Sequence, residues 1–146
     1  MKNCRDAGKA REFLALAGAR LSECRRLEES KLPNRMIARF AYLSLLYSAL
    51  SLLETLGLAG DFDLDAPPFE HEYKIMLFHV NFVRTGAVSR DISDALSAAF
   101  DIWMDNDRNP VTHISGGDSI SFVNLSEKLL SEAGKICERE FPLSDA

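Results

Sequence analysis

Residues 34–56 read NRMIARFAYLSLLYSALSLLETL, and this stretch decides the fold class. In a helix, its apolar side chains would surround most of the circumference: Ile37, Phe40, Ala41, Leu45, Tyr47, Leu52 and Leu56. A helix that is apolar nearly all round is buried on every side. Polar residues interrupt the apolar run at five places, namely Ser44, Ser48, Ser51, Glu54 and Thr55. The stretch therefore predicts the central helix of a bundle rather than a membrane span.

Four further helical segments flank this central helix. The apolar spacing predicts helices over about residues 6–29, 70–84, 89–105 and from 118 or 119 to 140. Proline or glycine stands between them, with Gly57 as the expected C-cap of the central helix. Short connections between long helices predict antiparallel neighbours. We therefore expect a single all-α domain over residues 1–146, an up-and-down bundle of four to five helices.

The composition suits one ordinary globular domain of 146 residues, 47% hydrophobic and 27% charged, with a net charge of -5. An acidic balance argues against extended, sequence-independent nucleic-acid binding, which needs a basic face. It leaves room for a small local basic site. The N-terminal residues MKNCRDAGKAREF contain no unbroken apolar core of the kind that secretory signals have. We expect a cytoplasmic protein that does not engage a membrane.

The three cysteines, Cys4, Cys24 and Cys137, are widely spaced and form no CxxC pair. This arrangement argues against a disulfide framework or a zinc site. Cys24 and Cys137 fall within apolar patterns, which predicts that both are buried small hydrophobic side chains.

Two other patterns could suggest a metal ion. The acidic residues of 61–65 have the spacing of a calcium loop, but Ala66 stands where the sharp turn needs glycine. His71 and His79 lie eight residues apart, whereas four suits a single metal. The sequence therefore predicts no metal site, and no motif in it implies a cofactor.

Several features of the chain occur together in one known family. The central helix carries Arg and Tyr side chains and is followed by Gly57-Leu58. Eleven residues after His71 comes Phe82-Val83-Arg84-Thr85-Gly86, and a further helical stretch reaches Phe100-Asp101-Ile102. The small stand-alone branch of the HEPN superfamily has a similar central helix, then a His, then Phe-Val-Lys-Thr-Gly at the same spacing, then a helix ending in Phe-Glu-Leu-Arg. Over roughly residues 35–107 the chain resembles that branch.

The resemblance implies a four- to five-helix bundle that forms a homodimer. Many HEPN proteins are metal-independent ribonucleases, often toxins paired with a nucleotidyltransferase-type antitoxin. Others are non-catalytic binding modules. For this chain, the resemblance implies an RNA substrate in the first case and a partner protein or a nucleotide in the second.

The resemblance also indicates where catalytic residues would lie. HEPN nucleases place an Arg, a polar residue and a His in an R-x(4–6)-H motif. Cleavage of RNA by its own 2′-hydroxyl needs a base near that oxygen and a cation on the phosphate, which His and Arg supply without a metal. In this chain Trp103 stands at the position of the family Arg and Arg108 at that of a family Tyr, whereas Asp107 matches the family Asp.

A sequence with the motif's spacing follows directly, because residues 108–113 read RNPVTH. If this segment is catalytic, Arg108 stabilises the charge on the phosphate, His113 acts as acid and base, and Asn109 orients them. Pro110 places the segment in a loop, whereas the family motif normally runs on into a helix that fixes both side chains. The segment could instead bind phosphate without catalysis, or be an ordinary surface loop.

Four residues are candidates for contacts with the substrate. Arg35 and Arg39 share one face of the central helix, where they could bind phosphate beside the motif segment or lie at the rim of a dimer. Asp107 and His71 match family positions, and His71 could have either a structural role or a role toward the substrate.

Two functions therefore stay open, with a generic helical adaptor outside the HEPN superfamily as a third. The first is a homodimeric, metal-independent endoribonuclease of toxin or defence type. The second is a non-catalytic HEPN module that binds a partner protein or a nucleotide. Trp103 favours the second, because replacing a cation by a large aromatic side chain favours protein contact over phosphate contact.

Overall fold

The computed structural model describes residues 5–31, 33–104 and 114–142, and these residues form helices and connecting turns without a strand. The all-α prediction is confirmed. The five helices are α1 (Ala7–Glu29), α2 (Asn34–Glu54), α3 (Pro68–Phe78), α4 (Arg90–Met104) and α5 (Gly116–Glu140). A π-helical turn, η1 (His79–Val83), continues α3.

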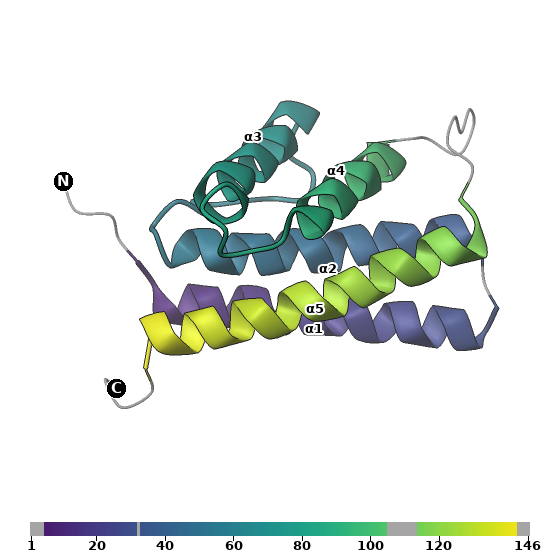
Figure 1. Cartoon of the computed structure of the whole chain (residues 1–146), viewed down its shortest axis with the longest axis horizontal. Helices are drawn as coiled ribbons and strands as arrows, with labels where there is room; N and C mark the ends of the chain where they lie inside the picture. Colours follow the sequence, from purple (N-terminus) through teal and green to yellow (C-terminus); the bar gives the residue numbers. More distant parts are fainter. Residues whose placement is uncertain (1–4, 32, 105–113, 143–146) are drawn as a thin grey trace.

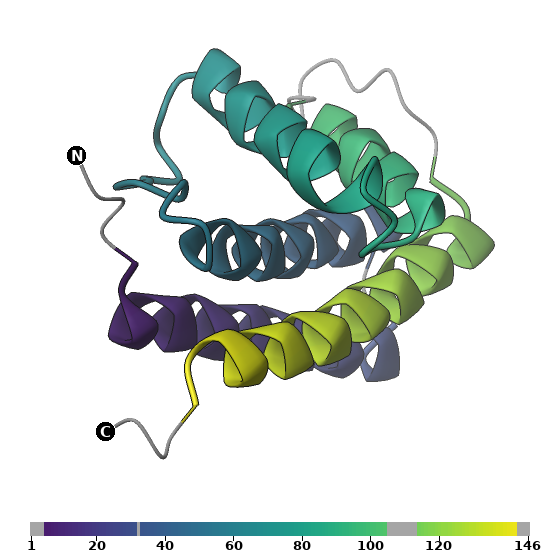
Figure 2. The same cartoon turned by 60° about the vertical axis from the view of Figure 1, so that its left-hand side comes forward.

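The central position predicted for residues 34–56 is confirmed. Helix α2 lies between two layers, with α1 and α5 on one side and α3 and α4 on the other (Figures 1 and 2). Fifteen of its 21 residues are buried, including Leu45, Leu46 and Leu50. By length and composition alone α2 could also cross a membrane, but 78% of its apolar stretch is buried inside the protein. Packing against four other helices accounts for this apolar sequence without a membrane.

Small side chains let the long helices approach α2 closely. Ser44 on α2 donates a hydrogen bond to the carbonyl of Ala17 on α1 at 3.0 Å, and Ser126 on α5 donates one to the carbonyl of Ala41 on α2 at 3.3 Å. These bonds satisfy hydroxyl groups that would otherwise be costly to bury. Of the serines that interrupt the apolar run of α2, Ser44 and Ser51 donate to carbonyls, whereas the hydroxyl of Ser48 is buried without a hydrogen-bond partner among the described residues.

Helix α5 runs parallel to α2, whereas α1 runs antiparallel to both. Cys137 on α5 bonds to Ser51 on α2, just as Ser126 bonds to Ala41, so the two helices advance together. The strict up-and-down alternation that we expected is not followed. The reason is the connection over residues 55–67, which returns along α2 and brings His71 beside Tyr42 rather than beside the end of α2.

The Phe-Val-Arg-Thr-Gly segment forms the corner between α3 and α4. Phe82 and Val83 end the π-helical turn with their side chains in the core. Gly86 follows with a φ of +85°, a backbone conformation that favours glycine, and the N–H of Val88 closes the corner on the carbonyl of Phe82 at 2.8 Å. This segment therefore has a clear structural role in the fold.

The ends of α2 and α5 follow local sequence signals. Gly57 has a φ of +71°, and the N–H groups of Gly57 and Leu58 bond back to the carbonyls of Glu54 and Leu53, so the predicted C-cap is confirmed. Helix α5 begins at Gly116, two or three residues before the predicted start, because Ser115 and Asp118 bond to each other's backbone N–H groups as a capping box.

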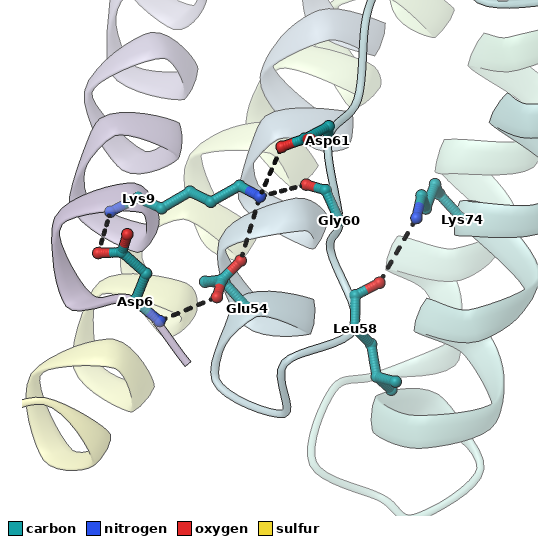
Figure 3. A network of polar contacts seen from close by, with 7 residues as sticks. All are labelled: Asp6, Lys9, Glu54, Leu58, Gly60, Asp61 and Lys74. Carbon is teal, nitrogen blue, oxygen red and sulfur yellow. Dashed lines mark hydrogen bonds and ion pairs between the residues drawn. The ribbon is translucent and has the colours of Figure 1, made fainter. Parts of the chain in front are cut away.

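A buried carboxylate ties the first helix to the end of α2 (Figure 3). Glu54 is only 2% exposed, accepts a hydrogen bond from the N–H of Asp6 at 3.0 Å, and lies 3.8 Å from the ammonium of Lys9. The same ammonium contacts the carbonyl of Gly60 and the carboxylate of Asp61. One lysine thereby links α1, the end of α2 and the connection that follows it.

We predict that Lys9→Met is more destabilising than Glu54→Gln. The first substitution leaves a buried carboxylate without its cation and should lower the free energy of unfolding by about 3 kcal/mol. The second removes the charge but keeps an oxygen for the Asp6 N–H, and should cost about 1 kcal/mol. Urea denaturation followed by circular dichroism measures both.

A matched control is Arg26→Met, which removes an exposed ion pair with Glu23 within α1 and should change stability by less than about 0.5 kcal/mol. Equal effects of Lys9→Met and Arg26→Met would contradict a structural role for the Lys9–Glu54 contact.

Candidate functional site

Both arginines predicted on the central helix line one pocket. The pocket has a volume of about 460 Å³ and lies between the N-terminal half of α2 and the C-terminal end of α4. Its cationic side chains are Arg35 and Arg39, and its remaining walls are Pro33, Met36, Phe40, Leu43 and Trp103. Pockets for small ligands are commonly of this size, largely apolar and provided with a few polar groups.

The structure brings Arg39 and Trp103 into direct contact. The guanidinium carbon of Arg39 lies 4.7 Å from the centre of the indole ring, and Nη1 donates a hydrogen bond to the carbonyl of Trp103 at 3.3 Å. The ring of Trp103 also lies 5.5 Å from that of Tyr42 in the core. Trp103 is half-buried, so its ring joins the core to the pocket.

This arrangement revises the interpretation of Trp103 from the sequence. An aromatic side chain at the family Arg position was expected to favour protein contact. It does contact protein, but it also lies under a guanidinium and forms a wall of the pocket. A cation over an aromatic face is attracted to the ring, and both groups present flat surfaces on which a planar ligand can stack.

Sequence reasoning missed the apolar part of this pocket. Met36 is 44% exposed, and Phe40, which the sequence placed on the buried circumference of the central helix, is only half-buried. The sequence carried no signal for this exposure, because helical periodicity does not show where neighbouring helices stop covering α2.

His71 lies in the core rather than in the pocket. It is 1% exposed, with Tyr42 Oη 2.8 Å from its Nδ1 and the carbonyl of Leu64 3.2 Å from its Nε2. Its ring stacks on Tyr42 and Phe100 and meets the edge of Phe62. Of the two roles considered for His71, this geometry favours the structural one.

The contacts of His71 indicate which ring nitrogen carries the hydrogen and which charge state the ring has. A carbonyl only accepts, so Nε2 carries the hydrogen toward Leu64, and in the neutral ring Nδ1 accepts from the hydroxyl of Tyr42. Burial lowers the pKa of His71 below its usual value, against the opposing effect of the Leu64 carbonyl. Burial likewise raises the pKa of the Tyr42 hydroxyl. The pair is therefore neutral.

The other predicted site residues, Asp107, Arg108, Asn109 and His113, lie outside the described residues. The catalytic assignment of Arg108, Asn109 and His113 stays a prediction, as does the substrate contact of Asp107.

The described cysteines are buried, as the sequence predicted. Cys24 contacts the carbonyl of Ile37, and Cys137 contacts that of Ser51, each at 3.6 Å. Burial raises the pKa of the Cys24 thiol to about 12, which disfavours the reactive thiolate. Over residues 5–31, 33–104 and 114–142, no group of three His, Cys, Asp or Glu side chains is placed to hold a metal ion.

Comparison of the chain with protein-family models, with curated proteins and with solved structures found no match.

We predict that the protein loses stability as the pH falls below 6.5, in part because of His71. The unfolded chain binds a proton at His71 near pH 6.5, whereas the folded protein does so only at a lower pH. The contribution of His71 is therefore fully present above pH 6.5 and is lost as the pH falls toward the folded pKa. Urea denaturation at a series of pH values down to about pH 5, where most carboxylates are still ionised, measures the slope.

The variant His71→Gln has no group that titrates in this range at the same position. Its free energy of unfolding should fall less steeply with decreasing pH than that of the wild type. Identical slopes for the two proteins would show that His71 does not resist protonation in the folded state.

Proposed function

We propose that the protein is a HEPN-like helical domain that binds a nucleotide unit, free or within a single-stranded RNA, in the pocket between α2 and α4. The observation that carries the proposal is the meeting of Arg35, Arg39 and the ring of Trp103 in one pocket. The all-α fold, with a central helix and the Phe-Val-Arg-Thr-Gly segment at a helix corner, is compatible with the HEPN resemblance but does not depend on it.

The chemistry of the pocket suits a nucleotide. Bases stack on aromatic rings and on guanidinium planes, and arginine binds phosphate oxygens through paired N–H groups. Trp103 and Phe40 supply aromatic surface, and Arg35 and Arg39 supply the cations at one end of α2. The net charge of -5 is compatible with a contact limited to one or two phosphates, since it opposes binding along an extended chain.

The binding proposal can be tested through Trp103, because it is the only tryptophan in the chain. Titration with a short single-stranded RNA, or with AMP or ADP, should change the tryptophan fluorescence and saturate. Arg35→Gln and Arg39→Gln should each weaken binding about tenfold, since each removes a charged hydrogen bond worth about 1.4 kcal/mol or more. With at most two phosphates contacted, log K should change with log salt by a slope of about -1.4 or less steeply.

Arg139→Gln is the matched control, because Arg139 is exposed near the end of α5, at the C-terminal end of α2 and far from the pocket. It should bind like the wild type. A wild type that gives neither a fluorescence change nor heat of binding with any of these probes would refute the proposal.

RNA cleavage is a second candidate function, supported by the RNPVTH sequence that starts five residues after Trp103. In this reaction the 2′-oxygen attacks phosphorus and the bond to the 5′-oxygen breaks, which leaves a 2′,3′-cyclic phosphate and a 5′-hydroxyl. A base must take the proton from the 2′-hydroxyl, and an acid must give one to the departing 5′-oxygen. Residues Arg108, Asn109 and His113 are the candidates for this chemistry.

We predict that the wild type cleaves single-stranded RNA in the presence of EDTA and that the Arg108→Ala, His113→Ala double variant does not. The double variant should still bind RNA in the fluorescence titration, whereas Arg39→Gln should weaken binding and lower the cleavage rate at low RNA concentration by a similar factor, about tenfold. Equal cleavage by wild type and double variant would exclude these residues as the catalytic pair. A wild type that binds RNA but does not cleave it would support only the binding function.

The homodimer and the nucleotidyltransferase-type antitoxin or other protein partner, which the resemblance implies, stay predictions. The cytoplasmic location expected from the N-terminal sequence also stays a prediction.

A further inference from the structure

A serine and a histidine that the proposed function does not use meet between α3 and α4. Ser93 Oγ lies 2.9 Å from His79 Nδ1. Ser93 belongs to α4 and is only 5% exposed, whereas His79 is the first residue of η1 and is half-buried. A hydroxyl within hydrogen-bond reach of a basic ring nitrogen is the pair with which enzymes make serine nucleophilic.

The pair borders a groove between the two helices, which lie on the same side of α2 (Figure 2). The groove has a volume of about 460 Å³, a size that suits a small ligand. Between its two ends it is lined by Ile75, Met76, Ser97 and Phe100. It shares no lining residue with the pocket between α2 and α4. The serine and the histidine therefore border a separate space that accommodates a small substrate.

The backbone departs from α-helical geometry at His79. The N–H of Arg84 bonds to the carbonyl of His79 at 2.9 Å, five residues away instead of four, which closes the π-helical turn. Such turns are rare, and within helices they often occur at functional sites. Phe82 and Val83 at the end of the turn are held in the core, so the position of His79 opposite Ser93 is fixed.

The start of α4 favours negative charge on Ser93 Oγ. Helix α4 begins at Arg90, so Ser93 lies in its first turn, where unpaired N–H groups give the helix end a partial positive charge. Arg90 and Asp91 in the same turn are both exposed, and their formal charges offset one another. In a neutral ring that carries its hydrogen on Nε2, His79 Nδ1 accepts the hydrogen of the Ser93 hydroxyl.

The other end of the groove is acidic. Glu72 lies seven residues before His79 on α3, and Asp101 lies eight residues after Ser93 on α4. At 1.5 Å per residue, both carboxylates are roughly 11 Å from the serine–histidine pair along the helices. Both side chains are exposed, and neither forms an ion pair with a residue that the structure describes. Charge complementarity therefore favours a substrate with a cationic group at this end.

We propose that the groove between α3 and α4 is an acyl-transfer site for a small ester of an amino alcohol, with Ser93 as the nucleophile and His79 as the base. The Oγ atom of Ser93 attacks the acyl carbon, and its proton passes to His79 Nδ1. The bond from the acyl carbon to the alcohol oxygen then breaks, and that oxygen takes the proton from His79 as the amino alcohol leaves.

Water completes the reaction. It attacks the acyl carbon on Ser93 and gives its proton to His79, the bond to Oγ breaks, and Oγ takes that proton back as the carboxylic acid leaves. In both halves His79 receives one proton and returns it, so no metal or redox partner is needed. Glu72 and Asp101 would hold the ammonium group of the ester, and the apolar wall of the groove would cover its carbon chain.

A fluorophosphonate probe tests the nucleophile on the full chain. Ser93 Oγ attacks phosphorus, fluoride leaves, and the hydroxyl proton is lost through His79. Mass spectrometry should show one phosphonyl group per chain, and peptide mapping should place it on Ser93. Ser93→Ala should prevent labelling. The matched control is Ser131→Ala, which changes an exposed serine of α5 and should be labelled at the wild-type rate.

The variant His79→Gln separates a base from a structural contact. Glutamine keeps a hydrogen-bonding group beside Ser93 but cannot take up its proton, so labelling should slow by about a hundredfold or more. Circular dichroism establishes that each variant folds. If His79 served only to join the two helices, a folded His79→Gln protein would be labelled as fast as the wild type.

Hydrolysis of acetylcholine, compared with its uncharged isostere in which carbon replaces nitrogen, tests the substrate class. The wild type should prefer acetylcholine. The double variant Glu72→Gln with Asp101→Asn should lower kcat/KM for acetylcholine roughly tenfold, because two partly exposed charge contacts are lost, and should leave the isostere unaffected.

A wild type that is not labelled at Ser93 overturns the proposal, as does a label spread over the exposed serines. Labelling at Ser93 without hydrolysis of either ester overturns ester hydrolysis, and equal rates for the two esters overturn the preference for an amino alcohol. None of these outcomes depends on nucleotide binding or RNA cleavage, which are measured separately.

Discussion

The fold depends on the burial of one helix along most of its length. Helix α2 packs against α1, α5, α3 and α4, and small side chains at two of these contacts bond directly to the backbone of the facing helix. A buried polar group without a partner would cost about 1–3 kcal/mol. The hydroxyls of Ser44 and Ser126 avoid that cost by bonding to carbonyls of the facing helix.

The two ends of α2 have different surroundings. At its C-terminal end Glu54 is enclosed by the start of α1 and the connection after α2. At its N-terminal end the covering is incomplete, so Met36 and Arg39 reach the surface beside Trp103. The pocket therefore arises where the central helix leaves the bundle.

Several residues that carry the family resemblance have structural roles in this fold. His71 is held between Tyr42 and Leu64, and Phe82 and Gly86 form a helix corner. Such residues can resemble a family because the bundle needs them, without implying its chemistry. Trp103, which the sequence resemblance aligns with the family Arg, contacts Arg39, so the cation beside it comes from α2. Binding thus has support from geometry, whereas catalysis rests on the sequence of residues 108–113.

The sequence by itself determined the all-α class, the places of the five helices, the cap at Gly57 and the burial of Cys24 and Cys137. These features follow from periodicity and capping, which act over one or two helical turns. It also identified Arg35 and Arg39, but not what surrounds them. Only the tertiary structure decided that Arg39 meets Trp103, 64 residues away, that His71 is enclosed, and that α5 runs parallel to α2. Such contacts depend on where a long connection returns the chain, and local patterns carry no information about that path.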